Sequence, residues 1–314
     1  EPMNKQLLLS EFLSTPWALM PERLQAMSGI LMRWSAEQPP SEETRFQVNT
    51  DRLIRDTRKQ MAASNTGSGI AMLPLYGVVT QRGNMVDDIS GPGSTSTQQF
   101  SAVLRQMPAD DTVGQILIDI DSPGGSVYGV SELAAEIMKA RERKPVIAVA
   151  NSLAASAAYW IGCSASDFYV TPGGEVGSIG VWQAHFDYSK ALEEDGVKPT
   201  LISAGKFKVE GNPYAALDPE AQAFMQSRVD DYYNAFIQAV ASGRGVAVSA
   251  VREGMGQGRV LGADAALSAG MVDGIACFDE VLSRMQASAR KSGRTQQPSS
   301  PSRLNKARAD LALI

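Results

Sequence analysis

Between residues 69 and 171 the sequence alternates short apolar runs with a segment of helical periodicity, and this alternation constrains the fold most. The runs typical of strands are GIAMLPLYGVVT (69–80), GQILIDID (114–121), PVIAVA (145–150) and DFYVT (167–171), with one more expected at VKPTLIS (197–203). Helices are predicted for SELAAEIMKARER (131–143) and for the segment that follows Ser156. Short apolar strands that alternate with helices predict a layered α/β fold with largely parallel strands.

The rest of the chain divides around this core. Apolar residues at intervals of three and four predict an N-terminal helical extension over 3–36, and the polar segment 37–68 is expected to be a linker. The core is assigned to 69–285 and is mostly helical in pattern after Asp218. Residues 286–314 are rich in Ser, Pro and Arg, which predicts a disordered tail.

Composition excludes several classes of protein. The formal net charge of −5, from 29 basic and 34 acidic residues, provides no broad basic field for nucleic acid. Two cysteines and one histidine argue against a disulfide framework and against most histidine-rich metal sites, so we expect no metal or cofactor and a reducing compartment such as the cytoplasm. The opening residues do not read as a secretory signal, and no apolar run is long enough to predict a membrane span.

The first candidate for chemistry is DSPGGSV (121–127), which follows a strongly apolar strand. The adjacent glycines Gly124 and Gly125 let backbone N–H groups approach a ligand closely, and a helix start here would add positive potential, so the turn could stabilise an oxyanion. The alternative is an ordinary strand-to-helix turn that Asp121 or Ser122 caps.

The second candidate is Ser156, in the small-residue segment LAASAAYWIG. A serine nucleophile needs a base, and a triad would have to use His185, which is more simply explained as a structural or surface imidazole. The Gly-x-Ser-x-Gly elbow of hydrolases is absent. A serine hydrolase here would therefore need a lysine base; otherwise Ser156 is a small residue that lets a helix pack closely.

The third candidate is the loop AGKFKVEGNPY (204–214), which contains Lys206 and Lys208. A lysine can act as a base only when it is neutral, and burial beside a positive helix end favours that state. The alternative is that both lysines are solvated loop residues.

The order of these motifs adds information that none of them carries alone. A Gly-Gly turn, an Ala-Ser-Ala helix start, VGSIGV (176–181) and GKFK followed by a proline resemble the signal peptide peptidase A family of Ser-Lys serine peptidases. The resemblance covers about residues 69–285, including RVLGADAALSAGMVDGI (259–275), and implies the Clp protease and crotonase fold of repeated ββα units. The segments TPWALMPERLQAM and GPGSTSTQQF resemble the bacteriophage branch, the prohead proteases related to the lambda head protein C.

The resemblance assigns roles to individual residues. Ser156 matches the nucleophile, and Lys208 matches the base because it follows Gly205 by three positions and precedes Pro213 by five, a spacing that disfavours Lys206.

Three glycine or alanine positions match the oxyanion site: Gly124, Gly125 and, through its N–H group, Ala157. Ser178 matches a lysine-orienting serine, although a turn serine accounts for it equally well. The family most often has Gly-Gly after the nucleophile, whereas this chain has Ala157-Ala158, a departure that could narrow the site.

The resemblance implies peptide hydrolysis without metal or cofactor. Implied substrates are extended peptides that pair with a strand edge, and for a phage enzyme these are scaffold, portal or capsid proteins, cleaved in the host cytoplasm or inside the prohead. A homo-oligomeric ring with active sites shared between subunits is also implied. Two alternatives stay open: a crotonase-like acyl-CoA enzyme, and an assembly or scaffold-binding protein with a vestigial site.

Overall fold

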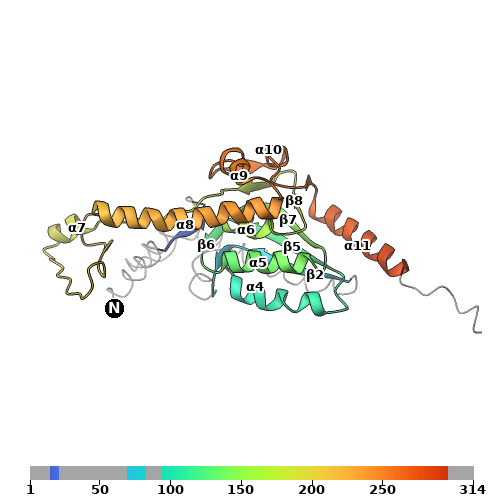
Figure 1. Cartoon of the computed structure of the whole chain (residues 1–314), viewed down its shortest axis with the longest axis horizontal. Coiled ribbons are helices and arrows are strands. Elements are labelled where there is room, and N and C mark those ends of the chain that lie inside the picture. Colours follow the sequence, from blue (N-terminus) through green and yellow to red (C-terminus); the bar gives the residue numbers. More distant parts are fainter. Residues whose placement is uncertain (1–14, 21–68, 83–93, 296–314) are drawn as a thin grey trace, which may run out of the picture.

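Two β-sheets and the helices around them make up the computed structural model, which describes residues 15–20, 69–82 and 94–295 (Figure 1). The strands are β1 (Trp17–Leu19), β2 (Ile70–Tyr76), β3 (Val78–Thr80), β4 (Ser94–Ser96), β5 (Gln115–Ser122), β6 (Gly124–Ser126), β7 (Val146–Ala155), β8 (Asp167–Val170), β9 (Glu175–Gly177), β10 (Val260–Gly262) and β11 (Gly274–Ile275). The helices are α4 (Thr97–Leu104), η2 (Met107–Ala109), α5 (Val130–Arg141), α6 (Ala157–Gly162), α7 (Ser189–Glu194), α8 (Pro219–Arg244), α9 (Val248–Gly254), α10 (Ala263–Ser268) and α11 (Phe278–Thr295).

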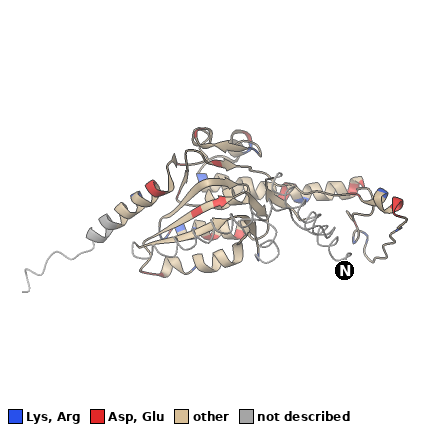
Figure 2. Cartoon of the chain, turned by 180° about the vertical axis from the view of Figure 1, so that it is seen from behind, with Lys and Arg blue, Asp and Glu red and all other residues tan. Residues whose placement is uncertain are grey.

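The larger sheet has seven strands, with β10, β9, β7, β5 and β2 in that order; β8 also pairs with β7, and β11 pairs with β8. All its described strand pairs are parallel except β9 with β10. Its central strands β5 and β7 are apolar along most of their length. The ribbon of the sheet is mostly tan in Figure 2, with a few acidic positions in red. Continuous apolar strands are typical of parallel sheets that are covered on both faces.

Alternate residues of the central strands pack against different layers. In β5, Ile116, Ile118 and Ile120 belong to the main core, which also contains the buried faces of α5, α6 and α8. Leu117 points to the opposite face and packs in a second cluster with Val281 of α11. The sheet therefore lies between a layer of helices on one face and α11 on the other. Successive side chains of a strand point to opposite faces of the sheet, so β5 contacts both layers.

Two long strands of the larger sheet, β2 and β5, each lead directly into a short strand of the smaller sheet. Gly77, with a φ of +69°, joins β2 to β3, and Pro123 joins β5 to β6. The smaller sheet has the order β1, β6, β3, β4, in which β6, β3 and β4 run parallel and β1 runs antiparallel. The helices α4 and α5 follow β4 and β6, so the core is built from repeated ββα units.

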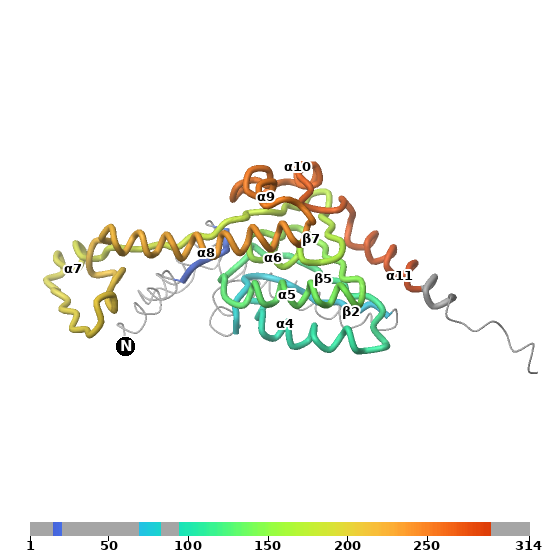
Figure 3. The backbone as a smooth tube through the Cα atoms, viewed as in Figure 1, coloured from blue at the N-terminus to red at the C-terminus, as the bar shows by residue number. Residues whose placement is uncertain are grey.

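Helices α7 and α8 form an arm that extends away from the sheets (Figure 3). The 26 residues of α8 correspond to a length of about 39 Å. Apart from Ala221 near its start, its buried side chains lie in the C-terminal part, where Phe236 stacks on Trp160 of α6 with ring centroids 4.6 Å apart. Within the described part of the chain, the body therefore holds the arm at its root.

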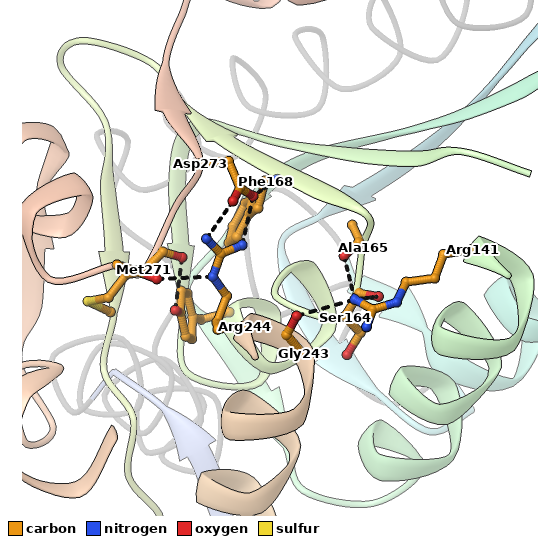
Figure 4. Close-up of polar contacts among 10 residues, drawn as sticks. Arg141, Ser164, Ala165, Phe168, Gly243, Arg244, Met271 and Asp273 are labelled. Carbon is orange, nitrogen blue, oxygen red and sulfur yellow. Dashed lines mark hydrogen bonds and ion pairs between the residues drawn. The ribbon is translucent and has the colours of Figure 1, made fainter. Parts of the chain in front are cut away.

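Two arginines fix this root to the body (Figure 4). Arg141 of α5 donates from Nη1 to the carbonyl oxygens of Ser164, Ala165 and Gly243 at 3.3, 2.8 and 3.3 Å. Arg244, at the end of α8, forms a two-bond pair with the Asp273 carboxylate at 2.7 and 2.8 Å. These bonds connect α8 to α5, to the end of α6 and to the segment before β11.

The predicted layered α/β fold with largely parallel sheets and repeated ββα units is confirmed. The strand expected at 197–203 is wrong: this segment is exposed and lies on the arm, where the structure gives it no strand partner. The helix expected through 17–19 is also wrong, because these residues form β1 on the smaller sheet. The helix α11 continues to Thr295, into the predicted tail. The linker 37–68, the rest of 3–36 and residues 296–314 lie outside the described residues.

Candidate active site

Ser156 stands at the junction between β7 and α6, in a strained conformation. Its φ of 55° and ψ of −119° lie outside the regions that non-glycine residues favour. The Ser156 N–H donates to the Gly177 carbonyl oxygen at 2.6 Å, and the Ser156 carbonyl oxygen accepts from the Trp160 N–H at 2.9 Å. A serine held on a sharp strand-to-helix turn is a known arrangement of a nucleophile, because the turn separates its Oγ from the backbone around it.

The Ser156 hydroxyl is poorly satisfied although the residue is only 1% exposed. Its one hydrogen bond among the described residues goes to the Gly180 carbonyl oxygen at 3.5 Å, the outer limit for such a bond. The side chain does not cap α6. The Oγ is therefore available for another partner.

Gly124 of β6 lies directly against this serine. Its φ is +96°, and an added Cβ would stand 2.9 Å from the Ser156 Cβ and 2.9 Å from the Ala155 carbonyl oxygen, and would also meet the Ala18 carbonyl oxygen. The Gly-Gly segment predicted for the oxyanion site therefore does meet Ser156. The helix expected directly after it does not occur, because Gly124–Ser126 form a strand and α5 begins only at Val130.

The predicted oxyanion donors differ in availability. The Ala157 N–H opens α6 and has no acceptor among the described residues. The Gly124 N–H donates to the Ser122 Oγ at 3.2 Å, and Gly125 pairs with Ala18 of β1. Ala157 is thus the donor that stands ready beside Ser156.

Ser178 lies next to the same junction. Its neighbour Gly177 pairs with Ala155, and Ser178 itself has a φ of 53° and donates its N–H to the Arg259 carbonyl oxygen at 2.8 Å. The Ser178 hydroxyl has no hydrogen-bond partner in the described part of the chain. The Ser178 backbone therefore forms part of a turn, and its hydroxyl can still bond to another side chain.

Lys208 does not reach this site within one chain. It lies in the segment between α7 and α8 on the arm, whereas α6 lies in the body (Figure 1). Lys208 is exposed and forms no side-chain hydrogen bond or ion pair with a described residue, whereas Lys206 pairs with Glu220 at 3.0 Å. His185 is also on the arm, where its Nε2 lies 3.0 Å from the Asn212 carbonyl oxygen.

Two features of the described residues bear on what a metal site and a membrane-spanning helix require. Nowhere in 15–20, 69–82 and 94–295 do three or more His, Cys, Asp or Glu side chains form a group that could hold a metal ion. None of the helices in the same ranges has the length and apolar character needed to cross a bilayer.

Sequence reasoning missed two walls of this site. Trp182 lies directly after the VGSIGV motif and pairs with Trp17 through a two-way backbone bridge. Trp17–Leu19 fill the space between Trp182 and β6. The apolar spacing of the N-terminal segment predicted a helix here. Pairing with β6 determines the conformation of Trp17–Leu19 instead, and this pairing cannot be read from the local pattern.

Comparisons with known proteins place the chain in a family. The model described as peptidase family S49 matches residues 138–292. The capsid assembly protease C of Escherichia phage lambda is 36% identical over 231 residues, which are 74% of this chain and 52% of that protein. The head-tail preconnector protein GP5 of Enterobacteria phage P21 is 33% identical over 251 residues, which are 78% of this chain and 49% of that protein.

Among solved structures, a ClpP1 point mutant from Listeria monocytogenes is 14% identical, with a TM-score of 0.44 over 71% of this chain and 99% of that chain. The chain spans about half the length of the two phage relatives. Family model and relatives agree with the motifs around Ser156: the chain belongs to peptidase family S49.

Proposed function

We propose that the chain is a serine endopeptidase in which Ser156 is the nucleophile and Lys208 the base. The observation that carries the proposal is the geometry at Ser156: a strained strand-to-helix turn, a weakly bonded Oγ, and the open Ala157 N–H beside it. Membership of a peptidase family supports the reaction class.

The proposed chemistry follows from these groups. Neutral Lys208 takes the Ser156 proton as Oγ attacks the scissile carbonyl carbon, and the Ala157 N–H, with the Gly-Gly segment, stabilises the oxyanion. Lysine then gives the proton to the leaving amine as the peptide bond breaks. A water molecule, deprotonated by Lys208, hydrolyses the acyl-enzyme and restores Ser156. Ser178 is proposed to orient the lysine with its hydroxyl.

We propose that the lysine comes from a neighbouring protomer of a homo-oligomeric ring. Among the described residues, the arm that carries Lys208 is held at its root, and large apolar side chains are exposed along it, among them Ile202 at 95% and Phe224 at 57%. Such a surface is costly in water, and a neighbour would bury it. A head-to-tail contact between copies is heterologous and can close into a ring.

The proposed substrates are extended polypeptides that add a strand to β6. We propose that these are phage head proteins, that is scaffold, portal or capsid proteins, cleaved in the host cytoplasm or inside the prohead; the name of the lambda relative, a capsid assembly protease, supports a role in capsid assembly.

Two matched pairs of variants test the proposal on a fluorogenic casein or peptide substrate. Ser156→Ala should lower kcat/KM by about 10⁴-fold or more, whereas Ser152→Ala, at an exposed serine of the strand β7 that precedes Ser156, should stay close to wild type. Lys208→Ala should be as inactive as Ser156→Ala, and Lys206→Ala should retain most activity. Wild-type rates in Ser156→Ala would refute the proposal, and a reversed order of the lysines would move the base to Lys206.

A further inference from the structure

The strand β1 is bonded on both of its edges to the walls of the candidate active site. On one edge it pairs antiparallel with β6, with Ala18 opposite Gly125 and Leu19 opposite Gly124. On the other, the Trp17 N–H donates to the Trp182 carbonyl oxygen at 2.9 Å, and the Trp182 N–H donates back at 3.1 Å. Trp182 closely follows Gly180, whose carbonyl oxygen accepts from the Ser156 Oγ.

The register places a backbone carbonyl of β1 at the serine. The Met20 N–H donates to the Pro123 carbonyl oxygen at 3.2 Å and the Val127 N–H to that of Pro16 at 3.4 Å. Along an antiparallel ladder, hydrogen-bonded pairs alternate with pairs that are not hydrogen-bonded. Ala18 and Gly125 lie midway between the bonded pairs Met20–Pro123 and Pro16–Val127, so they are also a hydrogen-bonded pair. The Ala18 carbonyl oxygen and the Ser156 Cβ also flank the same point beside Gly124.

The side chains of β1 fill separate spaces. Trp17 and Leu19 are 3% and 1% exposed and pack with Val78 and Trp182 in a cluster of their own, apart from the main core. Trp182 also donates from Nε1 to the Leu19 carbonyl oxygen at 3.0 Å. Ala18 points the other way, toward the main core, and is fully buried. The space thus accepts a small residue between two large apolar ones.

β1 also stands apart in topology from the sheet that it joins. The strands β6, β3 and β4 belong to the ββα units and run parallel, whereas β1 precedes these units and is the antiparallel member. Without β1, β6 would present an open edge, and an extended peptide binds such an edge by adding a strand.

We propose that residues Trp17–Leu19 are an internal competitor that occupies the peptide-binding groove of the protease, so that substrates must displace β1 to reach Ser156. The expected effect on catalysis rests on the proposed function, whereas the occupation of the groove rests on the pairing of β1 with β6 and Trp182. It also predicts the preferred ligand: an extended peptide with a small residue between two large apolar residues.

The test uses release of β1. Ala18→Pro removes the central N–H of the strand and disturbs its pairing, whereas Ala18→Gly keeps the N–H and serves as the matched control. Both are made with Ser156→Ala, and binding of a fluorescent peptide of residues 15–20 is measured against a scrambled peptide. The apparent Kd of a ligand equals its intrinsic Kd divided by the fraction of chains whose site is free. Release of β1 raises that fraction, so Ala18→Pro with Ser156→Ala should bind the peptide at least about tenfold more tightly than Ser156→Ala alone.

With Ser156 intact, Ala18→Pro should raise kcat/KM at least severalfold, chiefly through a lower KM, because a competitor acts on binding. A folded Ala18→Pro chain that binds the peptide no more tightly than its parent would overturn the proposal. Should that chain not fold, the double variant Trp17→Ala with Leu19→Ala takes its place, and failure of both to fold would identify β1 as a structural strand and overturn it as well. Because binding is measured without the nucleophile, absence of proteolysis would count against the proposed function alone.

Discussion

Gly124 lies so close to Ser156 that a Cβ at position 124 would stand 2.9 Å from the Ser156 Cβ. Carbon atoms never approach this closely without a shift, and the φ of +96° adds strain for any residue except glycine. The glycine is therefore needed both for the turn and for the position of the serine.

Gly124→Ala should lower kcat/KM by about 100-fold or more, because the added methyl displaces Ser156 and the Ala155 backbone that holds it in the turn. The free energy of unfolding should fall by about 1 kcal/mol or more. The matched control is Gly173→Ala, where an added Cβ meets nothing within 4 Å. Peptidase assays and urea unfolding of both variants check this, and equal activities of the two would contradict the assigned contact.

The two ends of α8 should respond differently to the same substitution. Phe236→Ala should destabilise the fold by about 3–5 kcal/mol, because this ring is fully buried against Trp160. Phe224→Ala removes a ring that is 57% exposed, so it should change stability by less than about 0.5 kcal/mol. The same variant should weaken oligomerisation, as measured by analytical ultracentrifugation. An unchanged oligomeric state in Phe224→Ala would show that Phe224 does not contribute to the interface.

The sequence predicted the central layers and the local residues of the site because both depend on short-range patterns. Strands β5 and β7 are apolar along most of their length, and Ser156 with Ala157 lies within a single junction. The place of β1 could not be predicted, because Trp17 and Trp182 are far apart in sequence and meet only in the fold. The segment 197–203 shows the opposite error: its apolar residues resemble a strand, yet they lie on an arm beside which the described residues of one chain form no sheet.

The two cysteines should differ in reactivity. Burial raises the pKa of Cys163 to about 12, so at pH 8 only about 10⁻⁴ of this thiol is the reactive thiolate. Cys277 is exposed. Iodoacetamide at pH 8 should therefore modify Cys277 alone in the folded protein and both cysteines in urea, as mass spectrometry of peptides would report. Comparable labelling of Cys163 in the folded chain would show that α6 opens readily.

Acid should weaken the anchor of the arm. Burial alone would raise the pKa of the Asp273 carboxyl, but hydrogen bonds from Arg244 and the Phe168 N–H, with the guanidinium charge, outweigh it and hold the pKa below its ordinary 3.8. The stabilisation is therefore complete above about pH 3.8 and is lost as the pH falls through the lower folded-state pKa.

Asp273→Asn should lower the free energy of unfolding by about 1–3 kcal/mol at pH 7. Its difference from wild type should shrink as the pH falls below 3.8 and through the lower folded-state pKa, where the wild-type carboxylate also loses its charge. Urea unfolding across this range measures the difference, with Asp264→Asn on the exposed face of α10 as control. A difference that does not depend on pH would assign the effect to packing.

The central claim is an active site built from Ser156 of one protomer and Lys208 of its neighbour, and co-assembly tests it most directly. Ser156→Ala and Lys208→Ala chains, each inactive alone, are coexpressed, and mixed oligomers are confirmed by native mass spectrometry. With random and equal mixing, about one interface in four pairs an intact serine with an intact lysine, so activity should return to about a quarter of wild type. Confirmed mixed oligomers that stay as inactive as their parents would contradict a shared site.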